Sequence, residues 1–210
     1  MFCIAQGGDN GKKREVPSAL RTILNIDAAI TDKFCSIVDA VAPRISRANL
    51  KYLEISCHGV PWIGFWLAFT ILWSSPSLYQ IQVNFMIGLI LDIVAVAVIK
   101  AITRRRRPMK NESDMFLTIG PDHYSFPSGH SSRAGFVASF FASHLALPAW
   151  FTFNLYLWSA AVCVSRVLLR RHHVLDVLAG IVLGLFETLF LNVIWFDQDW
   201  CEWLLSSFLS

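Results

Sequence analysis

Five long apolar runs constrain the fold of this chain more than any other feature of its sequence. Each contains 17–23 residues, which is the length an α-helix needs to cross the hydrocarbon core of a bilayer. The runs are residues 53–73, 81–102, 131–147, 150–168 and 174–196. Because 55% of the 210 residues are hydrophobic, a water-soluble domain of this size would expose too much apolar surface. The sequence therefore predicts an all-α, polytopic membrane helix bundle with about five spans.

An amphipathic helix is predicted before the first run, over residues 18–44. Its apolar residues recur at three- and four-residue steps, namely Ile23, Ile26, Ile30, Phe34, Ile37 and Val41. Charged residues fall between them, so this helix is expected to lie in the membrane interface or to pack on the bundle. Residues 1–17 are polar and glycine-rich and are expected to be disordered. Residues 50–198 are expected to form the membrane domain, and residues 199–210 a short C-terminal tail.

Lysines and arginines are concentrated on one side of the predicted bundle. Basic blocks precede the first run, follow the second and follow the fourth, whereas the other two short connections contain none. With five spans, all of these blocks face the same side, which the positive-inside rule assigns to the cytosol. The C-terminus, which carries Asp197, Asp199 and Glu202, is then expected in the lumen.

Three polar clusters carry the candidate chemistry. Residues 100–108 end the second span, residues 126–130 open the third, and residues 165–176 connect the fourth to the fifth. All three are predicted on the same membrane face, so a helix bundle would bring them together.

The middle cluster, Pro127-Ser128-Gly129-His130, predicts a turn that enters a helix. Ser128 can cap this helix, and Gly129 lets an anion approach the backbone closely. Free N–H groups and the helix dipole favour a phosphate at such an end, and His130 would lie on the first turn beside it. The alternative is an ordinary capped helix start with an incidental histidine.

The third cluster places His172 and Asp176 four residues apart, on one face of a helix. A carboxylate there can hold one ring nitrogen and leave the other available as a nucleophile. The alternative is a surface pair among basic neighbours. His173 points to a different face and is interpreted as a bystander.

Lys100, Arg107 and Arg166 are suited to bind the oxygens of a phosphoryl group. Their alternative role is snorkelling to the interface, and we favour that role for residues 104–106. Nucleic-acid binding is not predicted, because the basic run abuts a span and lacks interleaved aromatic residues.

The three clusters resemble, in order and spacing, the signatures of the type 2 phosphatidic acid phosphatase family, the lipid phosphate phosphatases. That family shares a superfamily with vanadium haloperoxidases and glucose-6-phosphatase, so the resemblance implies a vanadium-haloperoxidase-like helical core. The patterns are K-x6-R-P, P-S-G-H and S-R-x5-H-x3-D. Their defining positions are Lys100, Arg107 and Pro108; Pro127, Ser128, Gly129 and His130; and Ser165, Arg166, His172 and Asp176.

The resemblance implies a mechanism. His172 attacks phosphorus to form a phosphohistidine, Asp176 orients His172 and balances its charge, and His130 protonates the leaving oxygen. The groups implied to bind the phosphate and stabilise the transition state are Lys100, Arg107, Arg166, Ser128 and Gly129. No cofactor is implied. No divalent metal is expected either, since the sequence lacks a carboxylate cluster suited to magnesium.

Further segments resemble the polyisoprenoid diphosphate phosphatase branch, which includes presqualene diphosphate phosphatase. They are residues 50–62, 104–108, 114–116 and 124–127. This resemblance implies farnesyl, geranylgeranyl or presqualene diphosphate as substrates, with lipid monophosphates as lesser ones. It also implies the endoplasmic reticulum membrane and nuclear envelope. The active site is predicted at the cytosolic face.

Other functions remain open at this point. The chain could be a phosphatidate or sphingolipid phosphate phosphatase, or a non-catalytic membrane scaffold of the same fold. Asp92, His144 and Glu187 are ionisable groups at membrane depth, as in channels and transporters, although no repeat or broken helix accompanies them. A haloperoxidase would need vanadate in the phosphate site, and a membrane-embedded chain suits a lipid phosphoester better.

Overall fold

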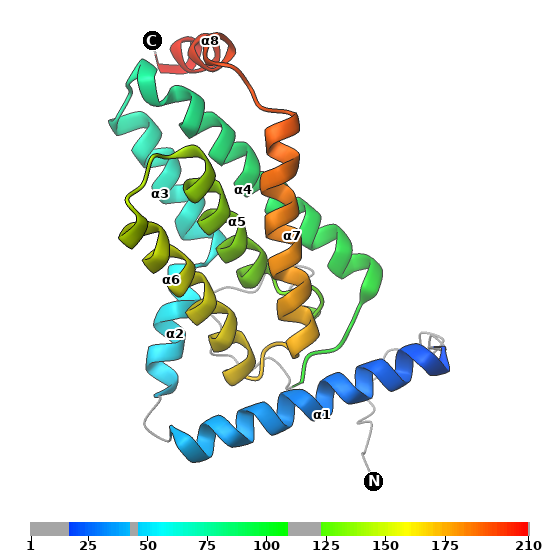
Figure 1. Cartoon of the computed structure of the whole chain (residues 1–210). Helices are drawn as coiled ribbons and strands as arrows, with labels where there is room; N and C mark the ends of the chain where they lie inside the picture. Colours follow the sequence, from blue (N-terminus) through cyan, green and yellow to red (C-terminus); the bar gives the residue numbers. More distant parts are fainter. Residues whose placement is uncertain (1–16, 43–45, 109–122, 210) are drawn as a thin grey trace.

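The computed structural model describes residues 17–42, 46–108 and 123–209, and over these residues it contains helices and no strand. The helices are α1 (Ser18–Val41), α2 (Arg47–Ser56), α3 (Gly59–Leu72), α4 (Pro76–Thr103), α5 (Gly129–His144), α6 (Ala149–Leu168), α7 (Val174–Val193) and α8 (Gln198–Leu209). Helices α2–α7 form an elongated bundle, while α1 crosses one end and α8 lies at the other (Figure 1). The expectations for residues 1–16, 43–44 and 114–116 fall outside the described residues.

The membrane character predicted from the apolar runs is confirmed. In the described part of the chain, α4, α6 and α7 are each long and apolar enough to cross a bilayer. Helices α2 and α3 meet the same criterion together, as a pair bent by 45°. The bend interrupts the first predicted span at Cys57 and His58, where the His58 ring accepts the N–H of Val60 at 3.4 Å and so begins a new helix.

The third predicted run forms α5, a central helix of the bundle. Its 16 residues rise about 24 Å, and every residue from Ser131 to Phe140 is buried. The polar residues that dilute this run make contacts inside the bundle. Arg133 pairs with Asp92 of α4 at 2.7 Å, and the Ser139 hydroxyl lies 2.6 Å from that of Thr188 on α7.

Helices α5 and α7 approach each other closely at two glycines. A methyl group at Gly180 would meet the carbonyl oxygen of Ser128, and one at Gly184 would collide with the backbone of Ser132. Small residues spaced by four on one helix allow this kind of backbone contact. The Ser128 N–H donates to the Asp176 carbonyl at 2.9 Å, so the second and third polar clusters are fixed side by side.

Helix α1 packs on the bundle with its polar face. Asp27, Thr31 and Cys35 are buried, and their contacts are with the start of α7 and the end of α6. The apolar residues of α1 point outward: Leu20, Ile23, Ile26, Ile30, Phe34, Ile37 and Val41 are all exposed. Helix α1 is therefore both packed on the bundle and apolar on its free face, which suits a helix lying in the membrane interface.

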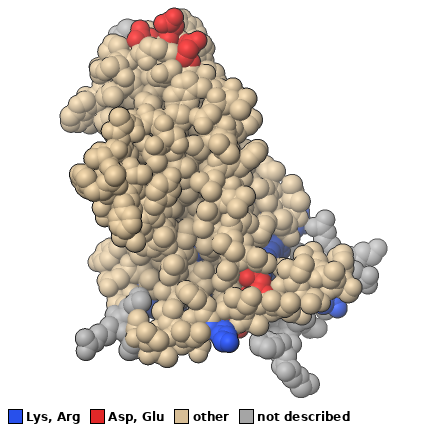
Figure 2. Space-filling view, in the orientation of Figure 1, with Lys and Arg blue, Asp and Glu red and all other residues tan. Residues whose placement is uncertain are grey.

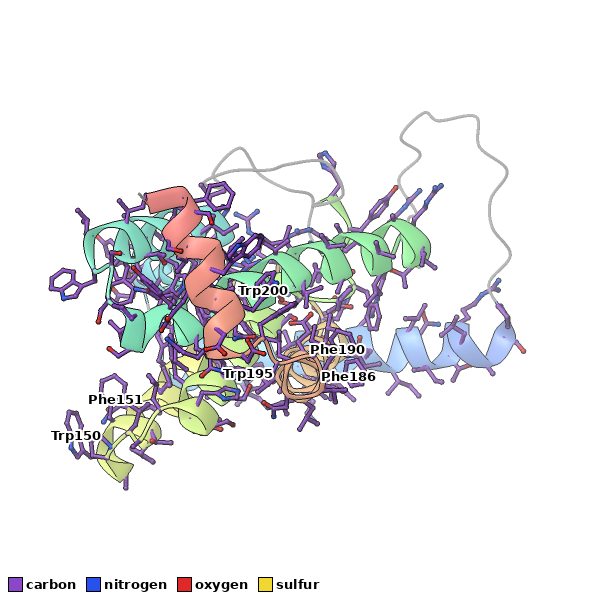
Figure 3. The ribbon with its side chains drawn as sticks, turned by 90° about the horizontal axis from the view of Figure 1, so that it is seen from above. Trp150, Phe151, Phe186, Phe190, Trp195 and Trp200 are labelled. Carbon is purple, nitrogen blue, oxygen red and sulfur yellow. The ribbon has the colours of Figure 1, made fainter. Side chains whose placement is uncertain are left out.

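The two ends of the molecule differ in charge. On the face drawn in Figure 2, acidic side chains gather at the end that carries α8, and the band below them is uncharged. The α1 end carries basic side chains together with an acidic cluster. Seen from the α8 end, Trp150 and Phe151 project outward from the bundle (Figure 3), as aromatic residues do at a membrane–water interface.

Within the predicted C-terminal tail, residues 199–209 form most of α8. The Asp197 carboxylate accepts the N–H of Trp200 at 2.9 Å and supports the helix start. Buried Cys201 then packs against Tyr79 and Val83 of α4. Asp199 and Glu202 gave this segment a polar appearance, whereas Cys201, Leu204 and Leu205 supply a packing face.

Candidate active site

The first cluster surrounds the end of α4. Lys100 lies in the last turn and is buried. Arg104 ends the helix in a left-handed conformation, with φ of 49°, and its N–H donates to the Lys100 carbonyl at 3.0 Å. The following backbone pairs with the segment before α5, because the Ser125 N–H donates to the Arg105 carbonyl at 2.8 Å. This pairing fixes residues 105–107 beside the start of α5.

The second cluster forms the helix start predicted from the sequence. Ser128 is the buried N-cap of α5, and its hydroxyl oxygen accepts the N–H of Ser131 at 3.3 Å. Gly129 lies against α4, where an added methyl would sit 3.2 Å from Val96. His130 occupies the first turn, and its ring centroid lies 5.9 Å from that of His58. Its Nε2 is buried and has no hydrogen-bond partner among the described residues.

The third cluster is the turn between α6 and α7. Arg166 is fully buried, and its carbonyl accepts the N–H of Arg171 at 3.2 Å and of His172 at 3.3 Å. The His172 Nδ1 lies 2.7 Å from the carbonyl oxygen of Ser125. Because a carbonyl only accepts hydrogen bonds, Nδ1 carries the proton and Nε2 keeps its lone pair in the neutral ring. His172 is thus held in the tautomer that a nucleophile requires.

Cations from the first and third clusters surround the two histidines. Burial lowers the pKa of His172 well below its ordinary value, and the cations of Arg107, Arg166 and Lys100 lower it further. The ring is therefore neutral and unprotonated on one nitrogen at physiological pH. Burial also lowers the pKa of His130 well below its ordinary value, and the charges of Arg166 and Lys100 are among those that lower it further. The predicted histidines and cations therefore share one electrostatic environment.

Asp176 contacts different partners from those expected. Its Oδ2 is 3.9 Å from the His172 Nδ1, which is too long for a hydrogen bond. The same oxygen accepts the backbone N–H of His173 at 2.8 Å and lies 3.3 Å from its Nδ1. At the third position of α7 the carboxylate turns back toward the residue that caps the helix. Asp176 thus contacts His173 directly and His172 only electrostatically.

Two further charged residues reach the site without having been predicted to do so. Arg105 donates to the Oδ1 of Asp176 at 2.6 Å, although the sequence gave no reason to separate it from Arg104 and Arg106. Glu54 of α2 lies 3.2 Å from the buried guanidinium of Arg166. Its only sequence signal was its place in the segment 50–62 that resembles the isoprenoid branch.

No group of three or more His, Cys, Asp or Glu side chains in the described ranges is arranged to hold a metal ion. An apolar groove of about 620 Å³ lies between α2 and α6. It is lined by Leu50, Leu53, Leu157, Val164 and Leu168 among others, and also by Ser165, the residue before Arg166.

Fold and site together define a polytopic helical membrane protein with two histidines and several basic side chains clustered at one end of its bundle. Residues 81–200, which contain all three motifs, match the family described as the PAP2 superfamily. The chain belongs to that superfamily.

Similar proteins agree with this assignment. The chain is 36% identical over 205 residues to "Probable lipid phosphate phosphatase beta" of Arabidopsis thaliana, covering 84% of this chain and 92% of that protein. It superposes on Aquifex aeolicus LpxE with a TM-score of 0.56 at 18% identity, over 75% of this chain and 92% of that one. The PAP2-type phosphatidylglycerolphosphate phosphatase of Bacillus subtilis gives a TM-score of 0.52 at 23% identity, over 84% and 94%. At these identities the two structures establish the shared fold alone.

Proposed function

We propose that this protein is a metal-independent membrane phosphatase that hydrolyses isoprenoid diphosphates and lipid phosphates through a phosphohistidine intermediate. The observation that carries the proposal is that backbone contacts at Ser125 and Ser128 join the three polar clusters. His172 and His130 thereby lie in the same region as the cations of Lys100, Arg107 and Arg166. These side chains supply a nucleophile, an acid–base group and fixed positive charge.

The proposed reaction has two steps. The His172 Nε2 attacks phosphorus, and the bond from phosphorus to the leaving oxygen breaks. His130, protonated once the negative charge of the bound phosphate raises its pKa, gives its proton to that oxygen. Neutral His130 then takes a proton from water, which attacks phosphorus and breaks the phosphorus–nitrogen bond to release phosphate. Fixed cations stabilise the charged transition state in both steps, which is usually the largest contribution.

The apolar groove between α2 and α6 supports a lipid substrate. Its lining reaches Ser165, while the neighbouring Arg166 belongs to the cationic cluster. We propose that the hydrocarbon tail lies along this groove and that its phosphate reaches the cations. The segments that resemble the polyisoprenoid diphosphate phosphatase branch favour an isoprenoid tail.

We further propose that the site faces the cytosol, in the membrane of the endoplasmic reticulum and nuclear envelope. The basic residues lie at the α1 end and the acidic residues Asp197, Asp199 and Glu202 at the α8 end, which is the distribution that the positive-inside rule assigns to this orientation. A diphosphate headgroup can then be bound and hydrolysed at the membrane surface while the hydrocarbon tail of the substrate stays in lipid.

The test is phosphate release by purified protein from farnesyl diphosphate, presqualene diphosphate, phosphatidate, sphingosine phosphate and glucose 6-phosphate, each with and without EDTA. We expect the diphosphates to be hydrolysed fastest and EDTA to have no effect. Preference for phosphatidate or sphingosine phosphate would favour a lipid monophosphate phosphatase instead. Loss of all activity in EDTA, restored by magnesium, would contradict metal independence, and no release from any substrate would favour the scaffold.

A further inference from the structure

Helix α1 reaches the candidate site through a chain of three charged side chains. The Arg105 guanidinium donates to the Asp27 Oδ2 of α1 at 2.6 Å and, through its other terminal nitrogen, to the Asp176 Oδ1 at 2.6 Å. Asp27 and Asp176 are buried, and the Arg105 side chain is 11% exposed. One planar cation thus connects α1 to the carboxylate four residues after His172.

The same face of α1 also caps α7. The first backbone N–H groups of a helix have no partner within it, and in α7 two of them find acceptors on α1. The N–H of Leu175 donates to the Asp27 Oδ1 at 3.0 Å, and the N–H of Val174 to the Thr31 hydroxyl at 3.2 Å. Asp27 therefore uses one oxygen to hold the start of α7 and the other to hold Arg105.

These contacts determine where the Asp176 carboxylate can point. Its Oδ1 is occupied by Arg105 and its Oδ2 by the backbone N–H of His173, which leaves Oδ2 3.9 Å from the His172 Nδ1. A planar guanidinium that donates to a different carboxylate from each terminal nitrogen fixes direction as well as charge. Rotation of Asp176 would bring its negative charge closer to His172 or take it away, and would loosen the turn that carries the ring.

We propose that Arg105, held by Asp27 of α1, is a positioning residue that fixes Asp176 and thereby the charge and placement of His172. The proposal rests on the function proposed above, in which His172 is the nucleophile. It gives α1 a part in turnover: the helix that lies on the membrane interface also supports the reacting histidine. Arg104 and Arg106, the exposed neighbours in the same run, have no such part.

The test measures kcat and KM for the best substrate of the panel, together with inhibition by orthovanadate, a phosphate analogue that reports on the cation cluster. For Arg105→Gln we expect kcat to fall on the order of 100-fold, as a small misplacement of a reacting group can cause. KM and vanadate inhibition should change little. Asp27→Asn, which keeps an acceptor for Leu175, should lower kcat less. The double variant should resemble Arg105→Gln, because the two side chains act as a unit.

Arg104→Gln and Arg106→Gln are the matched controls and should retain wild-type kcat. Arg105→Lys keeps the charge but cannot bridge two carboxylates in one plane, so its kcat should be intermediate. Wild-type kcat in Arg105→Gln, full additivity with Asp27→Asn, or an equal loss in Arg106→Gln would each overturn the proposal. If Arg105→Gln does not fold, Asp27→Asn decides: a lower kcat with unchanged vanadate inhibition supports it, and wild-type kcat overturns it.

The two proposals fail in different ways. Full activity in His172→Ala would overturn the nucleophile and, with it, the positioning of that nucleophile. An inactive His172→Ala beside a fully active Arg105→Gln would overturn the positioning role alone.

Discussion

At the scale of single residues, His172 is oriented before any substrate binds, since the Ser125 carbonyl fixes its tautomer and Arg166 holds its backbone. We expect His172→Ala to abolish turnover, because loss of a covalent nucleophile costs several orders of magnitude. A phosphoenzyme trapped by acid quench from radiolabelled substrate should appear in the wild type and vanish in this variant. Equal labelling of both proteins would mean that another residue is the nucleophile.

Asp176→Asn tests the charge of that carboxylate separately from its hydrogen bonds. The amide oxygen can still accept the N–H of His173, so the start of α7 should persist and the unfolding temperature in detergent should change little. The neutral amide cannot balance an imidazolium or pair with Arg105, and we expect kcat to fall by at least about tenfold. An unchanged kcat would remove Asp176 from the mechanism.

The residue types and their spacing allowed most residues of the candidate site to be proposed from the sequence. Contacts that depend on the folded backbone could not be predicted. The spacing of Lys100, Arg107, His130, Arg166 and His172 carries a recognisable chemical pattern. The acceptor for the His172 ring is a main-chain carbonyl, which every residue has and no sequence motif marks. Arg105 differs from Arg104 and Arg106 only in its tertiary contacts, so its two carboxylate partners emerge only from the fold.

At the scale of elements, the contact between α5 and α7 sets the distance between His130 and His172. We expect Gly184→Ala to lower both the unfolding temperature and activity, because its methyl group would collide with the backbone of Ser132, and overpacking typically costs about 1–3 kcal/mol. Gly64→Ala in α3 is the control, since nothing lies within 4 Å of an added methyl there.

Both substitutions improve helix propensity by about 1 kcal/mol, so a difference between them isolates the packing. Thermal unfolding in the same detergent should leave Gly64→Ala at or above the wild type and Gly184→Ala below it. Equal unfolding temperatures would mean that α5 and α7 can move apart without a loss of stability.

Hydrophobic periodicity predicted helix α1 but did not show which of its faces packs against the bundle. In a water-soluble protein the apolar stripe of such a helix packs inward, whereas here Asp27 and Thr31 pack inward and Ile23 and Ile30 face out. The arrangement is inverted because a bilayer can solvate the apolar stripe. The polar face accepts hydrogen bonds from the first N–H groups of α7, which have no partner within their own helix. The bend at His58 was not predicted, although Gly59 and Pro61 follow it and are residues typical of a helix interruption.

At the scale of the whole molecule, the separation of charge between the two ends predicts orientation. An N-glycosylation acceptor placed within residues 109–122 should remain unmodified in microsomes, while one added after Ser210 should be glycosylated. The basic α1 end is then cytosolic and the acidic α8 end lumenal. The reverse pattern of modification would place the chemistry in the lumen.

The ion pair between Glu54 and Arg166 has a consequence for how each cycle ends. Glu54 lies 3.2 Å from Arg166, the arginine proposed to bind phosphate. If Arg166 has that role, the carboxylate should compete with the departing phosphate for the cation and favour release of product. Glu54→Gln should make inorganic phosphate a stronger competitive inhibitor, by about tenfold if one buried ion-pair contact is at stake. Where release limits the rate, kcat should fall even though the reacting groups are intact. An unchanged inhibition constant for phosphate would mean that Glu54 does not compete with the product. A lower inhibition constant in the variant would mean that this buried carboxylate promotes the release of phosphate.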